Sequence, residues 1–134
     1  MKHISFSTEN DKGGIVFIHD AARPLVTPEL IARGASTLVP GNGAVPVVPV
    51  TDSLRHIGPC NSVSVSRSEY VAVQTPQVFF LSDILDAYES VEMSDPTLTD
   101  DASVAERFGL GIILFDGDPE NIKITHPKDF NILK

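Results

Sequence analysis

One stretch decides the fold: Gly14-Ile15-Val16-Phe17-Ile18-His19-Asp20-Ala21-Ala22-Arg23-Pro24. Residues 15–18 form an unbroken run of apolar, mostly β-branched and aromatic side chains, which is typical of a strand covered on both faces in a parallel sheet. The run ends at His19 and Asp20. Because open α/β sheets bind ligands beyond the carboxyl ends of their strands, Asp20 is a candidate ligand for a metal ion or a sugar.

The turn after this strand carries further ligand-type residues. Ala21 and Ala22 are small enough to let a ligand approach the backbone, which makes Ala21 a candidate cofactor contact. Arg23 follows, and its forked guanidinium suits phosphate. Pro24 prevents the turn from continuing as a helix. An isolated Asp is more often a turn cap and an isolated Arg a solvated charge, so the functional interpretation depends on the rest of the chain.

The composition limits the class of protein and its partners. The chain has 134 residues, the length of one domain, and we expect a single domain over residues 1–134. With 42% hydrophobic and 21% charged residues, it is typical of a soluble globular protein. The net charge of -8 argues against a nucleic acid partner, although local Arg and Lys residues still allow a small phosphorylated ligand.

Two further features bear on location. The one cysteine, Cys60, excludes an internal disulfide and fits a reducing compartment. No apolar run approaches the ~20 residues that cross a bilayer, and residues 1–12 are too polar for a signal peptide. We therefore expect a cytoplasmic protein with no membrane partner.

The remaining pattern predicts an α/β order of elements. Residues 1–13 are expected to form a loop, which leaves the central strand at 15–18 without its usual neighbouring strands. Further strands are expected at residues 44–50 and 111–115. Helices are expected after three capping residues, Thr27, Ser82 and Thr99, and again from Thr125 to the end, where three apolar residues should pack on the body: Phe130, Ile132 and Leu133.

Residues 52–71 differ in character from the rest. The segment Ser62-Val63-Ser64-Val65-Ser66 alternates polar and apolar side chains, and the turn Gly58-Pro59-Cys60-Asn61 precedes it. Together they predict a projecting β-hairpin, referred to below as the arm. Because an exposed two-stranded ribbon is marginally stable alone, we expect it to lie against a partner subunit.

Five separated motifs carry the ligand-type side chains. In chain order they are His19-Asp20-Ala21-Ala22-Arg23-Pro24, Val50-Thr51-Asp52-Ser53, Ser66-Arg67, Gln74-Thr75-Pro76-Gln77, and Thr99-Asp100-Asp101-Ala102-Ser103 together with Asn121-Ile122-Lys123-Ile124-Thr125. In this order and at these spacings, the set resembles the 2-C-methyl-D-erythritol 4-phosphate cytidylyltransferase family of the non-mevalonate isoprenoid pathway. The resemblance extends from about residue 15 to residue 134.

The resemblance implies both a fold and a reaction. The implied fold is an α/β, Rossmann-like nucleotidyltransferase three-layer sandwich, truncated at the N-terminus, with a projecting β-hairpin dimerisation arm. The implied reaction transfers CMP from the co-substrate CTP to 2-C-methyl-D-erythritol 4-phosphate and releases pyrophosphate, with Mg²⁺ as the divalent cation. Because charge builds on the phosphoryl oxygens, such catalysis depends on positioning and on cations.

The resemblance also implies roles for single residues. Asp20 would contact the metal ion or the cytidine ribose, and Arg23 would hold the sugar phosphate. Arg67 and Lys123 would be the two cations that position the attacking phosphate. Arg67 would reach the neighbouring subunit's site across a two-fold axis, which makes a homodimer the active form. Hydroxyl contacts to the substrate would come from Ser53, where the family usually has threonine, and from Thr75, Thr99 and Thr125.

Each of these residues also has a simpler interpretation. Alone, Arg67 is an edge-strand charge that discourages aggregation, and Lys123 is a solvated strand residue. Thr99 and Thr125 are already explained as helix caps. His19 is expected to be a packed histidine with a satisfied ring.

The sequence departs from the family pattern in one respect. The family carries a glycine-rich loop with an Arg that wraps the CTP triphosphate, and no Gly-x-Gly-x-Arg segment occurs here. The chain is therefore either a fragment of a cytidylyltransferase or a shortened, non-catalytic remnant that dimerises through its arm. We expect these 134 residues alone to release little or no pyrophosphate. Within the enzyme class, ribitol 5-phosphate is the alternative acceptor.

Overall fold

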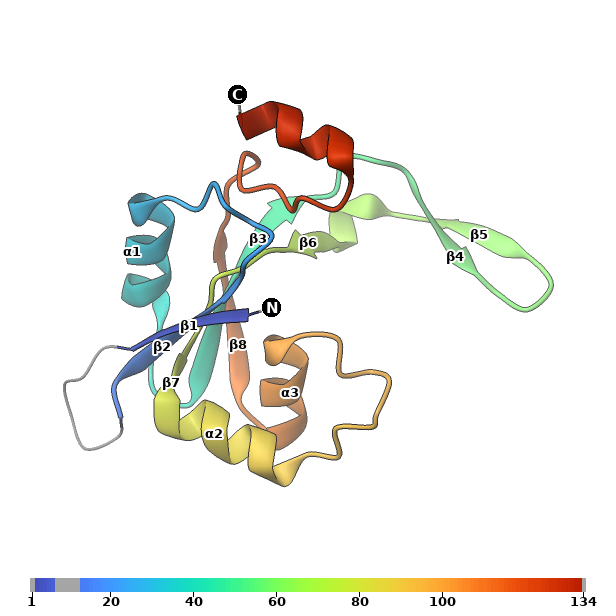
Figure 1. Ribbon diagram of the computed structural model, residues 1–134. Helices are drawn as coiled ribbons and strands as arrows, with labels where there is room; N and C mark the ends of the chain where they lie inside the picture. The colour runs from blue at the N-terminus through green and yellow to red at the C-terminus, as the bar shows by residue number, and fades with distance from the viewer. Residues whose placement is uncertain (1, 7–12, 134) are drawn as a thin grey trace.

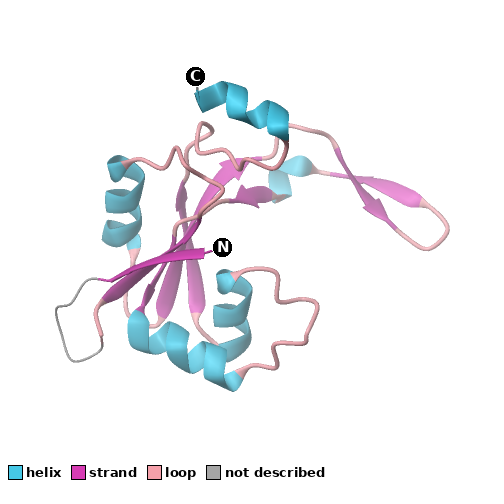
Figure 2. Ribbon diagram, in the orientation of Figure 1, coloured by secondary structure: helices cyan, strands magenta, loops and turns pink. Residues whose placement is uncertain are grey.

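A computed structural model describes residues 2–6 and 13–133 of the chain. The elements, in order, are β1 (Lys2–Phe6), β2 (Ile15–Asp20), α1 (Pro28–Thr37), β3 (Asn42–Pro49), β4 (Leu54–Ile57), β5 (Ser62–Val65), η1 (Arg67–Glu69), β6 (Val71–Val73), β7 (Gln77–Phe80), α2 (Leu81–Ser90), α3 (Asp101–Phe108), β8 (Gly111–Asp116) and η2 (Pro127–Leu133). Helix α1 lies on one side of a central sheet, while α2 and α3 lie on the other (Figures 1 and 2). The structure thus confirms the predicted three-layer α/β architecture.

The sheet differs from the expected parallel arrangement. Its strand order is β1-β2-β7-β3-β6, with β8 paired to β3. Strand β2 runs antiparallel to both of its neighbours, β1 and β7, and among the described strands only β3 and β8 pair in parallel. The prediction of a loop over residues 1–13 is wrong for residues 2–6, which form β1 along the edge of β2. Strand β2 therefore has a paired neighbour on each side, β1 and β7.

The core lies in two layers because strand side chains alternate between the faces of the sheet. On one face, Val16, Ile18 and Phe79 pack with residues of α2 and α3. On the opposite face, Val78 packs with Leu30 of α1 and with further core residues: Leu38, Ala44 and Phe115. A continuous apolar run such as that of β2 is required because both of its faces are covered.

The helix boundaries follow from their caps. Thr27 caps α1, as predicted, and its hydroxyl oxygen accepts a hydrogen bond from the Leu30 backbone N–H at 3.3 Å. The predicted caps Ser82 and Thr99 are wrong: α2 begins at Leu81 with Phe80 as its N-cap, and Asp100 caps α3. Asp100 and Ser103 form a reciprocal capping box that uses both side chains, which explains the shift of one residue from Thr99.

Residues of the last segment do not pack as expected. Residues 127–133 form the 3-10 helix η2, and Phe130, Ile132 and Leu133 are about half exposed, at 57%, 56% and 44%. Thr125 does not cap this helix, because its backbone N–H and hydroxyl instead donate to the carboxylate of Asp129. The segment packs on the body only in part, since Phe130 and Leu133 line an apolar hollow beside Ala21 and Ala22.

The arm projects from the body, as Figure 1 shows on the right of the view. Strands β4 and β5 pair only with each other, and the Gly58 N–H donates to the Asn61 carbonyl oxygen at 2.8 Å to close the turn. Two of its apolar side chains are uncovered, with Ile57 82% and Val63 56% exposed. The predicted projecting hairpin is confirmed. In the described ranges, no helix has the length and apolar character needed to span a bilayer.

Gly43 in β3 marks the tightest packing between the central strands and the core. A β-carbon there would lie 2.3 Å from Cε1 of Phe79, a ring that is fully buried. Glycine is required because the aromatic ring lies directly against the backbone of β3.

We predict that Gly43→Ala destabilises the fold by about 1–3 kcal/mol, because the buried ring must move out of its rotamer. Equilibrium urea unfolding measures this change. Gly58→Ala is the matched control, since its β-carbon would meet the movable Asn61 side chain at 3.0 Å and the Asn61 carbonyl oxygen at an ordinary contact distance of 3.4 Å. It should shift the free energy of unfolding by less than about 0.5 kcal/mol. Equal stability of Gly43→Ala and the wild type would contradict this account of the core.

Candidate functional site

A pocket of about 390 Å³ opens where β2 ends and β7 begins. Four segments distant in sequence form its wall: the end of β2, the loop before β7, the start of α3 and the extended segment at residues 121–125. The lining residues are Ile18, His19, Asp20, Arg23, Val73, Gln74, Thr75, Gln77, Thr99, Asp100, Asp101 and Lys123. Five of the residues singled out in the sequence therefore share one pocket: Asp20, Arg23, Thr75, Thr99 and Lys123.

A tight turn after β2 fixes the Asp20 carboxylate. The Ala22 backbone N–H donates to Oδ1 of Asp20 at 2.9 Å, and the Arg23 N–H donates to the Asp20 carbonyl oxygen, also at 2.9 Å. Such a local bond from an aspartate to the backbone two residues later is a common way to stabilise a turn. The carboxylate is therefore held at the pocket rather than free to rotate.

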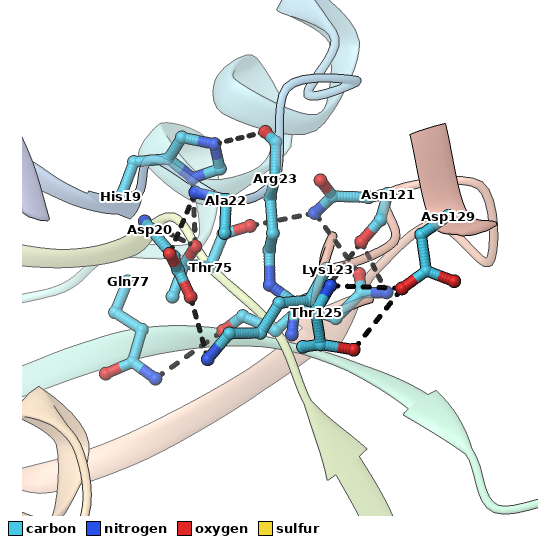
Figure 3. A network of polar contacts seen from close by, with 11 residues as sticks. His19, Asp20, Ala22, Arg23, Thr75, Gln77, Asn121, Lys123, Thr125 and Asp129 are labelled. Carbon is cyan, nitrogen blue, oxygen red and sulfur yellow. Dashed lines mark hydrogen bonds and ion pairs between the residues drawn. The ribbon is translucent and has the colours of Figure 1, made fainter. Parts of the chain in front are cut away.

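Lys123 reaches this carboxylate from the far end of the chain. The Ile124 N–H donates to the Ala22 carbonyl oxygen at 2.8 Å, which places the extended segment beside the turn. The Nζ atom of Lys123 then lies 3.1 Å from Oδ2 of Asp20 (Figure 3). Partial burial would raise the pKa of Asp20, but the Ala22 N–H and the Lys123 ammonium outweigh it and lower this pKa. Asp20 is therefore a stable anion.

Arg23 is the second cation of the pocket. One nitrogen, Nη1, donates to the Asn121 carbonyl oxygen at 2.7 Å, whereas Nε is buried without a partner. Burial lowers the pKa of Arg23 and the nearby Asp20 carboxylate opposes this change. Arginine remains protonated in proteins, so the pocket holds two positive charges against one fixed carboxylate at this end.

Three buried amide side chains, whose roles the sequence alone did not reveal, join the pocket segments. Gln74 bonds both ways with Asp118: its Nε2 donates to the Asp118 carbonyl oxygen at 2.9 Å and its Oε1 accepts from the Asp118 N–H at 3.1 Å. Asn121 donates from Nδ2 to the Thr75 carbonyl oxygen at 2.8 Å. Gln77 accepts from the Ala102 N–H at 2.9 Å and donates to the Asp100 carboxylate. The sequence signal that could have found two of them is a polar residue bordering an apolar run, as Gln74 follows Val73 and Gln77 precedes Val78.

The start of α3 is not an open anion site. The Ala102 N–H is taken by Gln77, and the Ser103 N–H is taken by the Asp100 carboxylate. The Asp100 and Asp101 side chains also bring negative charge to this side of the pocket. Phosphate is therefore better placed beside Arg23 and Lys123 than at the start of α3.

Four of the predicted residues lie outside this pocket. Ser53 is exposed at the start of the arm. Arg67, in η1, donates from Nη1 to the Thr51 carbonyl oxygen at 2.6 Å and so ties together the two ends of the arm. Thr125 is exposed and bound to Asp129. Ala21 lines a separate apolar hollow against Phe130 and Leu133.

The prediction about His19 is confirmed, since both ring nitrogens have partners. Nε2 lies 2.8 Å from the Arg23 carbonyl oxygen, and Nδ1 lies 2.9 Å from the Thr75 hydroxyl oxygen. Cys60 is exposed in the arm's turn and carries no disulfide.

A divalent cation has limited protein ligands here. In the described part of the chain, no group of three or more His, Cys, Asp or Glu side chains is arranged to hold a metal ion. Asp20 is the one sequence-predicted ligand, and each of its oxygens already accepts one hydrogen bond or ion pair. A carboxylate oxygen has a second lone pair, so Asp20 fits Mg²⁺ of the kind that is bound by one carboxylate together with substrate phosphates.

Comparison with known proteins supplies the family. The family model described as IspD, 2-C-methyl-D-erythritol 4-phosphate cytidylyltransferase, matches residues 5–134. The curated protein of that name from Bacteroides fragilis is 44% identical over 119 residues, which cover 89% of this chain and 53% of the relative. The bifunctional enzyme IspD/IspF from Solidesulfovibrio magneticus is 45% identical over 117 residues, covering 86% of this chain and 29% of that protein. The chain thus spans about half the length of the B. fragilis relative, or less than a third of the bifunctional one.

Solved structures agree with this result. The crystal structure of 2-C-methyl-D-erythritol 4-phosphate cytidylyltransferase from Thermus thermophilus matches with a TM-score of 0.73 and 32% identity, over 88% of this chain and 59% of that chain. The enzyme of the same name from Francisella tularensis matches with a TM-score of 0.78 and 26% identity, over 95% and 61%. The family model spans nearly the whole sequence. The chain therefore belongs to the 2-C-methyl-D-erythritol 4-phosphate cytidylyltransferase family.

Proposed function

We propose that this chain acts in cytidylyl transfer from CTP to 2-C-methyl-D-erythritol 4-phosphate, with release of pyrophosphate, and that the pocket binds the phosphorylated acceptor. The observation that carries the proposal is the convergence of Asp20, Arg23 and Lys123, which are up to 103 positions apart (123 minus 20), around one pocket. Family membership supports the same reaction, because the full-length relatives are named for it.

The charges of the pocket fit the acceptor. Arg23 and Lys123 would hold its phosphate by charge-assisted hydrogen bonds, and the fixed Asp20 carboxylate would accept from its hydroxyl groups. In the reaction, an oxygen of this phosphate attacks the α-phosphorus of CTP, a new P–O bond forms, and the bond to pyrophosphate breaks. Because Lys123 is half exposed and linked to the chain only through a flexible stem, it can leave Asp20 and follow the phosphate.

Mg²⁺, when bound, would neutralise phosphate charge in this reaction, and Asp20 is the residue that would hold it. Thr75 and Thr99 line the pocket and would contact the acceptor through their hydroxyl groups. Ala21, Ser53 and Thr125 remain proposed contacts. The single, exposed Cys60 supports a reducing compartment, and we place the function in the cytoplasm.

We further propose that the active form is a homodimer joined through the arm, with Arg67 completing the partner's site. Two observations support this. Ile57 and Val63 of the arm are uncovered in a single chain. Arg67 lies outside the pocket of its own chain, whereas its proposed role requires contact with a pocket. The bond from Arg67 to Thr51 would hold the arm's base in a fixed shape before a partner arrives.

The test of the acceptor site is binding of 2-C-methyl-D-erythritol 4-phosphate to the 134-residue chain, measured by calorimetry. Lys123→Ala should weaken this binding about tenfold or more, because a hydrogen bond to a charged group is lost. Lys128→Ala is the matched control and should bind as the wild type, since Lys128 is an exposed residue of η2 outside the pocket. Side-by-side titration with ribitol 5-phosphate decides between the two acceptors.

The Lys123→Ala substitution also changes a property that can be measured without a ligand. Removing the Lys123 ammonium should raise the pKa of Asp20, which ¹³C NMR of the carboxyl group follows directly. Equal acceptor binding by Lys123→Ala and Lys128→Ala would contradict the proposed site, even if the pKa of Asp20 changes as expected.

The dimer is tested separately by analytical ultracentrifugation. We predict that the wild-type chain sediments as a dimer, and that replacing Ile57 and Val63 together with Ser shifts it to the monomer, because the arm then has less apolar surface to bury. Leu85→Ser, at a 52% exposed position of α2, is the control and should remain a dimer. A monomeric wild type at high protein concentration would overturn the arm's proposed role.

A further inference from the structure

His19 has a hydrogen-bonding arrangement that the proposed reaction does not yet use. Its ring lies between the turn after β2 and the loop before β7, and both His19 and Thr75 line the pocket (Figure 3). Nε2 lies 2.8 Å from the Arg23 carbonyl oxygen. Nδ1 lies 2.9 Å from Oγ1 of Thr75.

The partners of the ring determine where its hydrogen lies. A backbone carbonyl oxygen can only accept, so the atom facing Arg23, Nε2, must carry the hydrogen. The opposite tautomer would place two lone pairs against each other at 2.8 Å. In the neutral ring Nδ1 is therefore an acceptor, and the hydrogen between His19 and Thr75 belongs to the Thr75 hydroxyl.

Thr75 is constrained from a second direction as well. The Asp20 backbone N–H donates to Oγ1 of Thr75 at 2.9 Å. A hydroxyl has one hydrogen and two lone pairs. With the hydrogen given to His19 and one lone pair taken by Asp20, a single lone pair remains for the pocket.

We propose that His19 is a positioning residue, which holds the Thr75 hydroxyl so that it accepts a hydrogen bond from a hydroxyl group of the acceptor and does not donate to its phosphate. Like Asp20, Thr75 then offers only an acceptor, and the two form a subsite for polyol hydroxyls next to the cations Arg23 and Lys123. The identity of the ligand in this inference rests on the proposed function. The hydrogen-bonding arrangement of His19 and Thr75 is independent of that function.

The arrangement itself is tested without ligand. Nitrogen-15 NMR of the His19 ring in mildly alkaline buffer should show the hydrogen on Nε2 and a bare Nδ1. The exposed His56 of the arm lies away from the Arg23 carbonyl oxygen and the Thr75 hydroxyl, and it should show a mixture of both tautomers. A hydrogen on Nδ1 of His19 would overturn the proposal.

The consequence for binding is tested with D-erythritol 4-phosphate and inorganic phosphate as probes. His19→Gln keeps a donor for the Arg23 carbonyl oxygen but removes the acceptor for the Thr75 hydroxyl. We expect it to weaken D-erythritol 4-phosphate binding about fivefold, the loss of one ordinary hydrogen bond, and to leave inorganic phosphate binding unchanged. His56→Gln is the matched control and should leave the binding of both probes unchanged.

A double-mutant cycle separates positioning from a merely structural role. In a Thr75→Val background there is no hydroxyl to orient, so His19→Gln should have no further effect on D-erythritol 4-phosphate binding. An equal loss for both probes, or a full additional loss in the Thr75→Val background, would overturn the positioning role. If the wild type binds neither probe while Nε2 carries the hydrogen, the hydroxyl subsite and the proposed acceptor fail, whereas the hydrogen-bond direction stands.

Discussion

The site depends on one backbone hydrogen bond, from the Ile124 N–H to the Ala22 carbonyl oxygen at 2.8 Å. It ties the C-terminal segment to the turn after β2, so that Lys123 reaches Asp20 and the Asn121 carbonyl oxygen meets Arg23. A side chain as long as lysine could not be aimed at a carboxylate by the sheet alone, because residues 121–125 belong to no strand. Backbone pairing therefore supplies the precision that regular structure does not.

Buried amides complete this attachment. Gln74 and Asn121 are 5% and 0% exposed, and they hold the loop before β7 to the C-terminal segment. Gln77 likewise holds the start of α3 to β7. Amides can bond to backbone groups of irregular segments in both directions, which a charged side chain cannot do without a partner. Uncharged amides thus join the pocket segments alongside two charged contacts, from Arg23 to the Asn121 carbonyl oxygen and from Lys123 to Asp20.

The sequence predicts local secondary structure better than it predicts which strands pair. The apolar, β-branched run at residues 15–18 favours a strand, but its antiparallel pairing with β7 depends on how the arm returns the chain through β6. The α3 cap was missed by one residue because Thr99 and Asp100 both suit it, and only Asp100 pairs with Ser103. The motifs predicted five pocket residues. The roles of the amides escaped because most of their partners are backbone atoms, which the sequence pattern does not identify.

The hydrogen bonds of the pocket have a consequence for folding. Those from Asn121 to Thr75, from Asp20 to Thr75 and from Arg23 to Asn121 join residues 46, 55 and 98 positions apart. Closing loops of this length costs conformational entropy, so the finished pocket requires distant parts of the chain to be in place together. A ligand that binds only this completed pocket would therefore stabilise the folded chain as a whole and raise its melting temperature.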